Sequence, residues 1–548
     1  MIIYQIFTRI FGNRNTTRKE WGTVAENGCG KMADIDARVL RRIHDMGVTH
    51  VWCTGVVRHA TQTDYTAKGI PAQHAEIVKG RAGSPYAITD YYDVDPDLAV
   101  NVANRMEEWE QLIARTHAAG MKVIMDFVPN HVAREYHSIC RPAGVRDLGE
   151  GDDTGMNFSV HNNFYYCWGQ ALDLSRVTPH QTYQERPARA TGNDHFDQRP
   201  GPDDWYETIK LNYGVDYCDA GGRSEHFDPV PDTWVQMRDI LLFWAAKGVD
   251  GFRCDMAEMV PAPFWAYATA AVRAAHPSVI FVGEVYNPGL YRTYIAAGFD
   301  YLYDKVGMYD SMRDIIWGRR WASDITTQWQ RTDDIRTHML YFLENHDEQR
   351  IASDYFAANP WRAFPAHMVC CLLQTNPYML YAGQELGERG MDREGFSGWD
   401  GRTSIFDYWS VDSIRHGYFD LAKKTPEERQ LMAAYRQVMR IAGRETAVTD
   451  GAMFDLMYVN THFAEKQFAF LRKAGREMLL VVVNFSDLSV CREVTIPAHA
   501  FDFMNIPVGT FTATELLTGV AKEFTLTPDG SIPVDIPDYG GVIYKFKF

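Results

Sequence analysis

The chain lacks several features that would each point to a particular class of protein. Its nine cysteines among 548 residues are odd in number, scattered and without a C-x-x-C pair, which predicts buried thiols rather than a disulfide framework. No apolar run approaches the ~20 residues of a membrane helix. The opening residues, MIIYQIF, have neither the basic region nor the cleavage-like site of a secretory signal. We therefore expect a soluble protein of the reducing cytoplasm that has no membrane partner.

The chain also lacks runs of lysine and arginine, and its overall charge is acidic. Lys and Arg number 55 against 71 Asp and Glu, so the formal net charge is −16. A nucleic-acid-binding protein needs a basic patch for the phosphates, so we expect no nucleic-acid partner. The G-x-S-x-G, H-E-x-x-H and P-loop motifs are missing too, which argues against the enzyme classes built on them.

What the chain does contain is a set of apolar runs of strand length that end in acids and histidines. They are MKVIMDFVPNH (121–131), GVDGFRCDMAE (248–258), VIFVGEVYNP (279–288) and HMLYFLENHDE (338–348). The segments between these runs are long enough to hold helices. Polar residues at the carboxyl ends of several strands are typical of a parallel α/β protein whose active site lies at that end.

Four further apolar runs complete a predicted (β/α)8 TIM barrel. They cover 2–11, 49–56, 299–307 and 377–387, and helical spacing is clear in 36–47, 105–120 and 232–248. About a hundred residues without periodicity interrupt this pattern, and short β runs without helices end the chain. We predict a catalytic barrel over 1–130 and 231–445, an inserted B subdomain over 131–230, and a C-terminal antiparallel β-sandwich over 446–548.

Arg253 and Asp255 are the first candidates for chemistry. Residues two apart in a strand lie on the same face, so the arginine can keep the aspartate ionised. Such a carboxylate can act as a nucleophile or as an electrostatic stabiliser near neutral pH. An isolated R-x-D is more often a structural ion pair, but here three other acid-ended runs accompany it.

The motifs resemble the α-amylase family, glycoside hydrolase family 13, over essentially the whole chain. The resemblance is carried by DFVPNH (126–131), GFRCDMAE (251–258), GEVY (283–286) and ENHD (344–347), in that order. KLNYG (210–214) is similar to a fifth family motif, and GSPYAITDYY (83–92) to the segment after the second strand. The resemblance implies a retaining mechanism with Asp255 as the nucleophile, Glu284 as the acid and base, and Asp347 as a third acid that binds sugar hydroxyls.

The resemblance also implies binding roles for several other residues. Tyr86 would form the stacking floor of the cleavage subsite, and His131 and His346 would hydrogen-bond the sugar there. Arg253 and Glu258 complete the predicted substrate-binding set; Glu258 stands where many relatives have a residue that contacts the sugar beyond the cut. Asn130 matches a position that binds Ca²⁺ in many relatives, although a structural capping amide is an equal alternative.

We therefore expect a hydrolase that cleaves α-1,4 bonds of starch-derived glucans or maltodextrins, with no organic cofactor. An α-glucan transglycosylase would share every catalytic residue, since only the acceptor of the second step differs. KLN in the fifth motif also favours the cyclomaltodextrinase and neopullulanase branch. A catalytically inactive carbohydrate-binding relative would be expected to lack some of the three acids, all of which are present. The sequence leaves the oligomeric state open.

Overall fold

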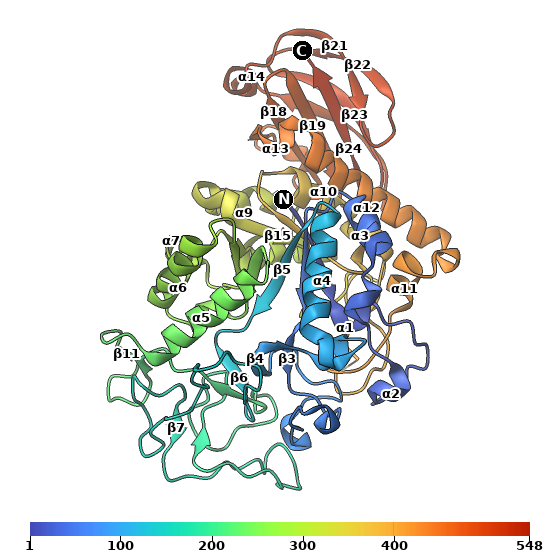
Figure 1. Ribbon diagram of the computed structural model, residues 1–548. Helices are drawn as coiled ribbons and strands as arrows, with labels where there is room; N and C mark the ends of the chain where they lie inside the picture. The colour runs from blue at the N-terminus through green and yellow to red at the C-terminus, as the bar shows by residue number, and fades with distance from the viewer. Residues whose placement is uncertain (398) are drawn as a thin grey trace.

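Eight parallel strands close into a barrel in the computed structural model, which describes residues 1–397 and 399–548 (Figure 1). The strands follow one another around the barrel in chain order, and the last pairs with the first. They are β1 (Ile2–Phe7), β2 (His50–Thr54), β5 (Lys122–Phe127), β12 (Gly251–Cys254), β13 (Ile280–Gly283), β14 (Tyr301–Tyr303), β15 (Met339–Phe342) and β16 (Tyr378–Tyr381). Nearly all their residues are buried, as expected for continuous apolar runs enclosed on both faces.

Helices between the strands surround the barrel, and local sequence explains where they begin. The Asp36 side chain accepts hydrogen bonds from two backbone N–H groups at the start of α3 (Ala37–His44). Thr425 and Glu428 form a capping box at the start of α12 (Pro426–Arg444). The other main helices are α4 (Arg105–Ala118), α5 (Asp232–Ala246), α6 (Ala262–Ala275), α7 (Tyr291–Ala296), α8 (Asp310–Trp317), α9 (Asp324–Arg331), α10 (Phe364–Leu372) and α11 (Asp412–Tyr418). Within residues 1–397 and 399–548, no helix has the length and apolar character needed to cross a bilayer.

Several strands end earlier than the apolar runs predict. The first run predicts a strand to residue 11, but β1 stops at Phe7 and the short helix α1 (Thr8–Phe11) follows. The sixth run predicts a strand to residue 307, but β14 stops at Tyr303. There the Asp304 side chain accepts a hydrogen bond from the backbone N–H of Met308 at 2.9 Å, which starts a helical turn. Side chains that bond to nearby backbone offer the chain an alternative to the strand.

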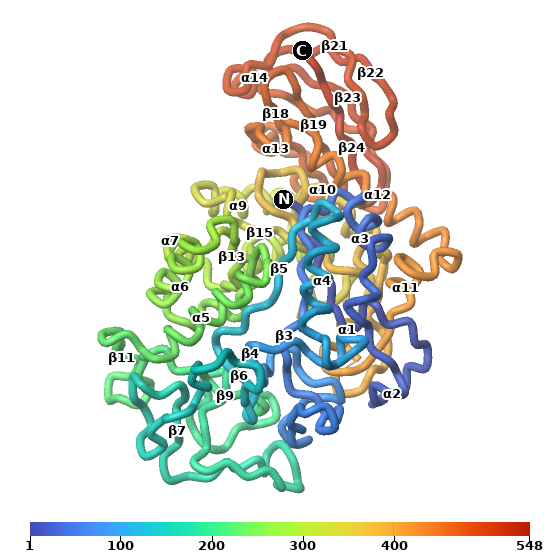
Figure 2. Tube along the Cα trace, viewed as in Figure 1, coloured from blue at the N-terminus to red at the C-terminus, as the bar shows by residue number. Residues whose placement is uncertain are grey.

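The long region between β5 and α5 contains little regular structure, and Figure 2 shows it gathered at the end of the barrel away from the C-terminal region. Its central pairing joins β6 (His131–Ala133) to β9 (Thr208–Lys210), with His131 opposite Lys210 and Ala133 opposite Thr208. This pairing ties the inserted region back to the chain that leaves β5. Two smaller pairs lie further out: β7 (Tyr166–Cys167) with β8 (Ala188–Arg189), and β10 (Val215–Asp216) with β11 (Ser224–Glu225).

Two antiparallel sheets form the C-terminal region. The larger sheet has the order β17-β18-β19-β24-β21-β22, and the smaller pairs β20 with β23. Their bounds are β17 (Ala452–Asp455), β18 (Gln467–Ala474), β19 (Glu477–Asn484), β20 (Val490–Ile496), β21 (Gly509–Glu515), β22 (Ala521–Leu526), β23 (Gly530–Ile536) and β24 (Gly540–Lys547). At Gly541 an added Cβ would lie 2.8 Å from Cε of Met368 on α10, so the sheet packs closely on the barrel. The predicted fold class, a TIM barrel with an insertion after its third strand and a C-terminal β-sandwich, is confirmed.

Candidate active site

The carboxyl ends of β12 and β13 bring two of the predicted catalytic acids to one guanidinium. Cys254 pairs with Gly283 in the barrel, so the next residues, Asp255 and Glu284, leave the two strands side by side. Arg253 Nη1 is 2.7 Å from Oδ1 of Asp255, and Nη2 is 2.8 Å from Oε2 of Glu284. The arginine is 1% exposed, so water screens these ion pairs little.

The two carboxylate oxygens of Glu284 have different partners. Oε1 accepts a hydrogen bond from the Tyr286 hydroxyl at 2.6 Å. Oε2 accepts one from the backbone N–H of Met256 at 2.8 Å, in addition to the ion pair with Arg253. Met256 has a φ of 44°, a left-handed conformation that is uncommon outside glycine, and its N–H thereby reaches Glu284. Within residues 1–397 and 399–548, the Tyr286 hydroxyl is the only partner of Oε1, and a hydroxyl can accept as well as donate a hydrogen bond.

Asp347 lies on the segment that follows β15. Its backbone N–H donates to Asn345 Oδ1 at 2.9 Å, which fixes the turn. Its Oδ2 is 3.2 Å from Nε2 of His346, and that same nitrogen is hydrogen-bonded to the Tyr86 hydroxyl at 2.5 Å. The rings of Tyr86 and His346 stack with centroids 5.3 Å apart. The histidine therefore holds both Tyr86 and Asp347 in position.

The three carboxyl groups share the charge of one guanidinium, so their protonation is linked. The Asp347 side chain is 41% exposed, and it opens onto the cavity described below. Burial in the walls around it, followed by the charge of Glu284, raises the pKa of Asp347 to about 7. Burial also raises the pKa of Asp255 well above its ordinary value, while the Arg253 charge opposes that rise. Asp347 and Asp255 therefore bind a proton more tightly than free carboxylates do.

The two predicted histidines are neutral under the same conditions. Burial, followed by the positive charge of Lys210, lowers the pKa of His131 to about 3. Burial and the charge of Arg253 lower the pKa of His346 well below its ordinary value. A neutral imidazole offers one hydrogen-bond donor and one acceptor, which suits contacts with hydroxyl groups.

A cavity of about 260 Å³ lies in front of these acids. It is lined by all three predicted catalytic acids together with Tyr86 and His131. Among the described residues, Arg253, His346 and Glu258 do not line it. Arg253 contacts the lining residues Asp255 and Glu284, and His346 contacts Tyr86 and Asp347, so the predicted roles of both in substrate binding stay predictions. The Glu258 carboxylate accepts a hydrogen bond from the backbone N–H of Asn287 at 3.0 Å, so its predicted contact with sugar stays a prediction.

The cavity also has lining residues that the motifs did not identify. These are Lys79, Ser84, Trp205, Glu207, Thr208, Met256, Tyr286, Ile405 and Phe406. Tyr286 could have been found, because it lies two residues after Glu284 and so faces the same side of an extended segment. Trp205 and Glu207 come from the inserted region, where no periodicity marks an element. Their position depends on the pairing of β9 with β6, which the local sequence does not reveal.

The surroundings of Asn130 do not fit the predicted calcium ligand, because a lysine ammonium takes its oxygen. Lys210 Nζ donates to Asn130 Oδ1, lies 2.7 Å from Asp194 Oδ1 and donates to the carbonyl of Met259 at 3.3 Å. An ammonium has three N–H donors, and these three oxygens match them. The Lys210 side chain is 2% exposed, so this positive charge occupies the place that a cation bound through Asn130 would need. We derive no chemical step from a metal here.

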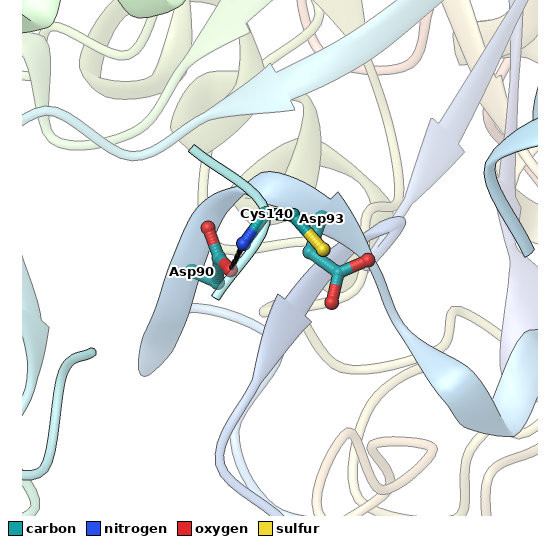
Figure 3. Close-up of side chains that lie close together, drawn as sticks. All are labelled: Asp90, Asp93 and Cys140. Carbon is teal, nitrogen blue, oxygen red and sulfur yellow. Dashed lines mark hydrogen bonds between the residues drawn. The ribbon is translucent and has the colours of Figure 1, made fainter. Parts of the chain in front are cut away.

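A second cluster of potential metal ligands is already neutralised. Figure 3 shows Asp90 and Asp93, both on β4 (Ile88–Val94), beside Cys140, whose backbone N–H donates to Asp90 at 3.0 Å. Arg58 lies 3.2 Å from a carboxylate oxygen of Asp90 and 3.3 Å from one of Asp93. Arg105 lies 2.6 Å from the other oxygen of Asp93. Two guanidiniums thus balance two carboxylates, and the cluster joins β4 to the inserted region as an ion-pair network.

Comparisons with known proteins agree with the motifs and the barrel. A family model described as the alpha amylase catalytic domain matches residues 5–424. Alpha-amylase 3 of Dictyoglomus thermophilum is 23% identical over 388 residues, which cover 67% of this chain and 68% of that protein. Alpha-amylase MalA of Haloarcula japonica is 24% identical over 542 residues, covering 97% of this chain but 60% of that protein. The crystal structure of an alpha-amylase from Geobacillus thermoleovorans superposes with a TM-score of 0.67 at 17% identity, covering 100% of this chain and 98% of that one. With a family match over most of its length, the chain belongs to the alpha-amylase family of glycoside hydrolases.

Proposed function

We propose that this protein hydrolyses α-1,4 bonds of starch-derived glucans or maltodextrins with retention of anomeric configuration. The observation that carries this proposal is the guanidinium of Arg253, which holds Asp255 and Glu284 through its two terminal nitrogens. Retaining glycosidases need two carboxyls roughly 5–5.5 Å apart, whereas inverting ones leave about 6.5–9.5 Å for a water. Two carboxylates on one guanidinium favour the shorter spacing.

In the first step Asp255 attacks the anomeric carbon of the sugar beside it. Asp255 lines the cavity; its Oδ1 is hydrogen-bonded to Arg253, while Oδ2 accepts no hydrogen bond from the described residues. The new bond forms from Oδ2 to the carbon as the glycosidic bond breaks, and Glu284 gives its proton to the departing oxygen. A proton on Oε1 of Glu284 is oriented by the Tyr286 hydroxyl, which then accepts rather than donates.

In the second step a water molecule attacks the same carbon. Glu284, now ionised, takes a proton from that water, and the bond between the sugar and Asp255 breaks. Arg253 stabilises the charge that returns to Asp255. Through the whole cycle Asp347 is placed to bind sugar hydroxyls, and the Tyr86 ring forms an apolar wall against which a sugar ring packs.

The substrate class is supported by ligands of the structural neighbours. The Geobacillus thermoleovorans alpha-amylase was crystallised with acarbose. The neighbour AmyP was crystallised with maltose and, as a variant, with maltotriose. These are α-linked glucose oligomers or their analogue. We propose the same class of ligand, an α-glucan oligosaccharide, for the cavity of this protein.

Product analysis from maltoheptaose, with wild-type and Asp255→Asn protein side by side, tests the proposal. We expect shorter maltooligosaccharides from the wild type and a loss of turnover of more than about 100-fold in the variant, because a covalent nucleophile is removed. Circular dichroism should show an unchanged fold. A variant that keeps more than about a hundredth of the activity would rule out Asp255 as the nucleophile.

The same chromatogram separates hydrolysis from its alternatives. Products longer than seven glucoses would show that a sugar hydroxyl, rather than water, accepts the glycosyl group, and would make the protein a transglycosylase. An unchanged substrate with both proteins would contradict the α-1,4-glucan proposal and would direct the assay to other α-glucosides, with sucrose and trehalose first.

A further inference from the structure

A buried ion pair in the cavity wall takes no part in the steps above. Lys79 Nζ lies 3.0 Å from Oε2 of Glu207, and the two residues are only 9% and 4% exposed. Lys79 comes from the loop before β4, and Glu207 precedes β9 in the inserted region. Both line the same cavity as Asp255 and Glu284. Removing two charges from water costs free energy, so we examined whether this pair has a role in binding a ligand.

The pair keeps hydrogen-bonding capacity for a ligand. Among the described residues, the only polar partner of Lys79 Nζ besides Glu207 is the carbonyl of Asp204, at 3.5 Å; the nitrogen also lies 5.1 Å from the centroid of the Tyr206 ring. In the described part of the chain, Oε1 of Glu207 accepts no hydrogen bond. An ammonium with donors to spare beside a carboxylate with a free oxygen matches the neighbouring hydroxyl groups of a sugar, each of which both donates and accepts.

Ser84 and Tyr86 belong to the same loop as Lys79, and all three line the cavity. Trp205, two residues before Glu207, packs against His131 with ring centroids 5.2 Å apart. Glu284 and Tyr286 instead follow β13. In the proposed mechanism Glu284 protonates the leaving sugar, so we assign the part of the wall that carries Tyr86 and His131 to the retained part of the substrate.

We propose that Lys79 and Glu207 are specificity-determining residues that bind the non-reducing-end hydroxyls of the retained sugars and close the cavity there. This inference rests on the proposed function, which it makes more specific: the enzyme removes short units from chain ends rather than cutting in the interior. The cavity volume of about 260 Å³ agrees, because it lies below the roughly 300–1,000 Å³ of pockets for drug-sized ligands and suits a short glycone.

A substrate with a blocked non-reducing end tests the inference directly. Initial rates are measured by chromatography on p-nitrophenyl α-maltoheptaoside and on the same compound carrying a 4,6-ethylidene group at its non-reducing end. We expect the wild type to cleave the free substrate at least about tenfold faster, the size expected when charge-assisted hydrogen bonds to the terminal hydroxyls are lost. In the double variant Lys79→Met, Glu207→Gln the ratio of the two rates should move toward one.

The double variant removes both charges together, so neither is left buried without its partner. Arg146→Met, Asp232→Asn is the control, because it too removes both members of an ion pair, at 2.6 Å, and neither residue lines the cavity. This control should keep the wild-type ratio. Equal wild-type rates on both substrates, or an unchanged ratio in the double variant, would overturn the inference and leave the proposed function standing. No cleavage of the free substrate would overturn both.

Discussion

Arg253 sets the charge balance of the cavity, because one guanidinium faces three carboxyl groups. Asp255 and Glu284 lie within 2.8 Å of it, and Asp347 adds a further negative charge nearby. The result is a site that binds a proton more tightly than the unfolded chain does. This arrangement makes stability depend on pH.

Replacing Asp347 by asparagine should stabilise the protein at alkaline pH while removing most of its activity. The pKa of Asp347 is raised to about 7 in the folded state, so the folded state binds its proton more tightly than the unfolded state. By linkage this contribution to stability is present below the ordinary Asp pKa of about 3.9 and is lost as the pH rises through about 7. The asparagine of Asp347→Asn does not titrate, so the variant avoids this loss. At about pH 8 its free energy of unfolding should exceed that of the wild type by on the order of 1 kcal/mol, a figure that allows for the 41% exposure of the Asp347 side chain.

Thermal unfolding of wild type and variant across pH measures this effect. The variant's Tm should equal that of the wild type near pH 4 and exceed it increasingly toward about pH 8. Asp487→Asn, on an exposed loop of the C-terminal region, is the control and should show no such trend. A difference in Tm that does not change with pH would contradict the raised pKa.

At the scale of elements, β9 positions two side chains: one lines the cavity, and the other places a positive charge beside Asn130. Thr208 lines the cavity at one end of the strand, and Lys210 places its ammonium against Asn130 at the other. Burial lowers the pKa of Lys210, while the charge of Asp194 opposes that change. The ion pair with Asp194 keeps this positive charge beside Asn130.

Chelation of divalent ions should therefore leave the stability of the wild type unchanged. We expect the same Tm with excess EDTA and with added Ca²⁺, because Lys210 already satisfies Asn130 and Asp194. Lys210→Asp exchanges the ammonium for a carboxylate and should make the Tm rise with Ca²⁺, by up to about 2.7 kcal/mol of stabilisation at a hundred times the Kd. Lys210→Met removes the ammonium without adding a ligand and is the control that should stay insensitive. An EDTA-induced fall in the wild-type Tm would contradict the inference that the Lys210 ammonium takes the place of a metal ion.

The secondary-structure elements were only partly predictable from the sequence. The barrel strands were predictable because each is a continuous apolar run, and a strand buried on both faces needs such a run. Helix starts were harder to predict: Asp232 is a favourable capping residue at the start of α5, but Pro231 holds the cap position and Asp232 pairs with Arg146 at 2.6 Å instead. Both residues are polar or turn-forming, so local sequence did not separate the two arrangements.

For the candidate site, the motifs identified the three acids because Asp255 and Glu284 directly follow barrel strands and Asp347 lies on the segment after β15. The residues that shape the cavity beyond them were not predictable in the same way. Lys79 and Glu207 meet only because a loop before β4 and the start of β9 approach in space. Such a contact depends on the tertiary arrangement of a region without periodicity, and neither residue lies in a motif.

For the whole molecule, one buried arginine connects the C-terminal sheets to the barrel. Arg472 on β18 donates to Leu373 O just beyond α10 at 2.7 Å and to Val448 O on α13 (Thr446–Thr449) at 2.7 Å. It also donates to Ala447 O at 3.0 Å and to Gly451 O at 2.8 Å. Burial lowers its pKa to about 10, yet it stays charged at neutral pH. Four backbone carbonyl oxygens, rather than a carboxylate, accept the hydrogen bonds of this guanidinium.

Arg472→Met should therefore destabilise the whole protein, because it leaves four carbonyls without this donor. Each unsatisfied buried acceptor costs about 1–3 kcal/mol, so we expect a loss of at least about 3 kcal/mol in the free energy of unfolding. Urea titration followed by tryptophan fluorescence and circular dichroism should show a lower midpoint for both signals. Arg492→Met, on β20, is the control, because that exposed side chain donates only to Cys491 O at 3.4 Å. If Arg472→Met changes stability by no more than the control, within about 0.5 kcal/mol, then the packing of β19 and β24 on α10 holds the two parts together without the arginine.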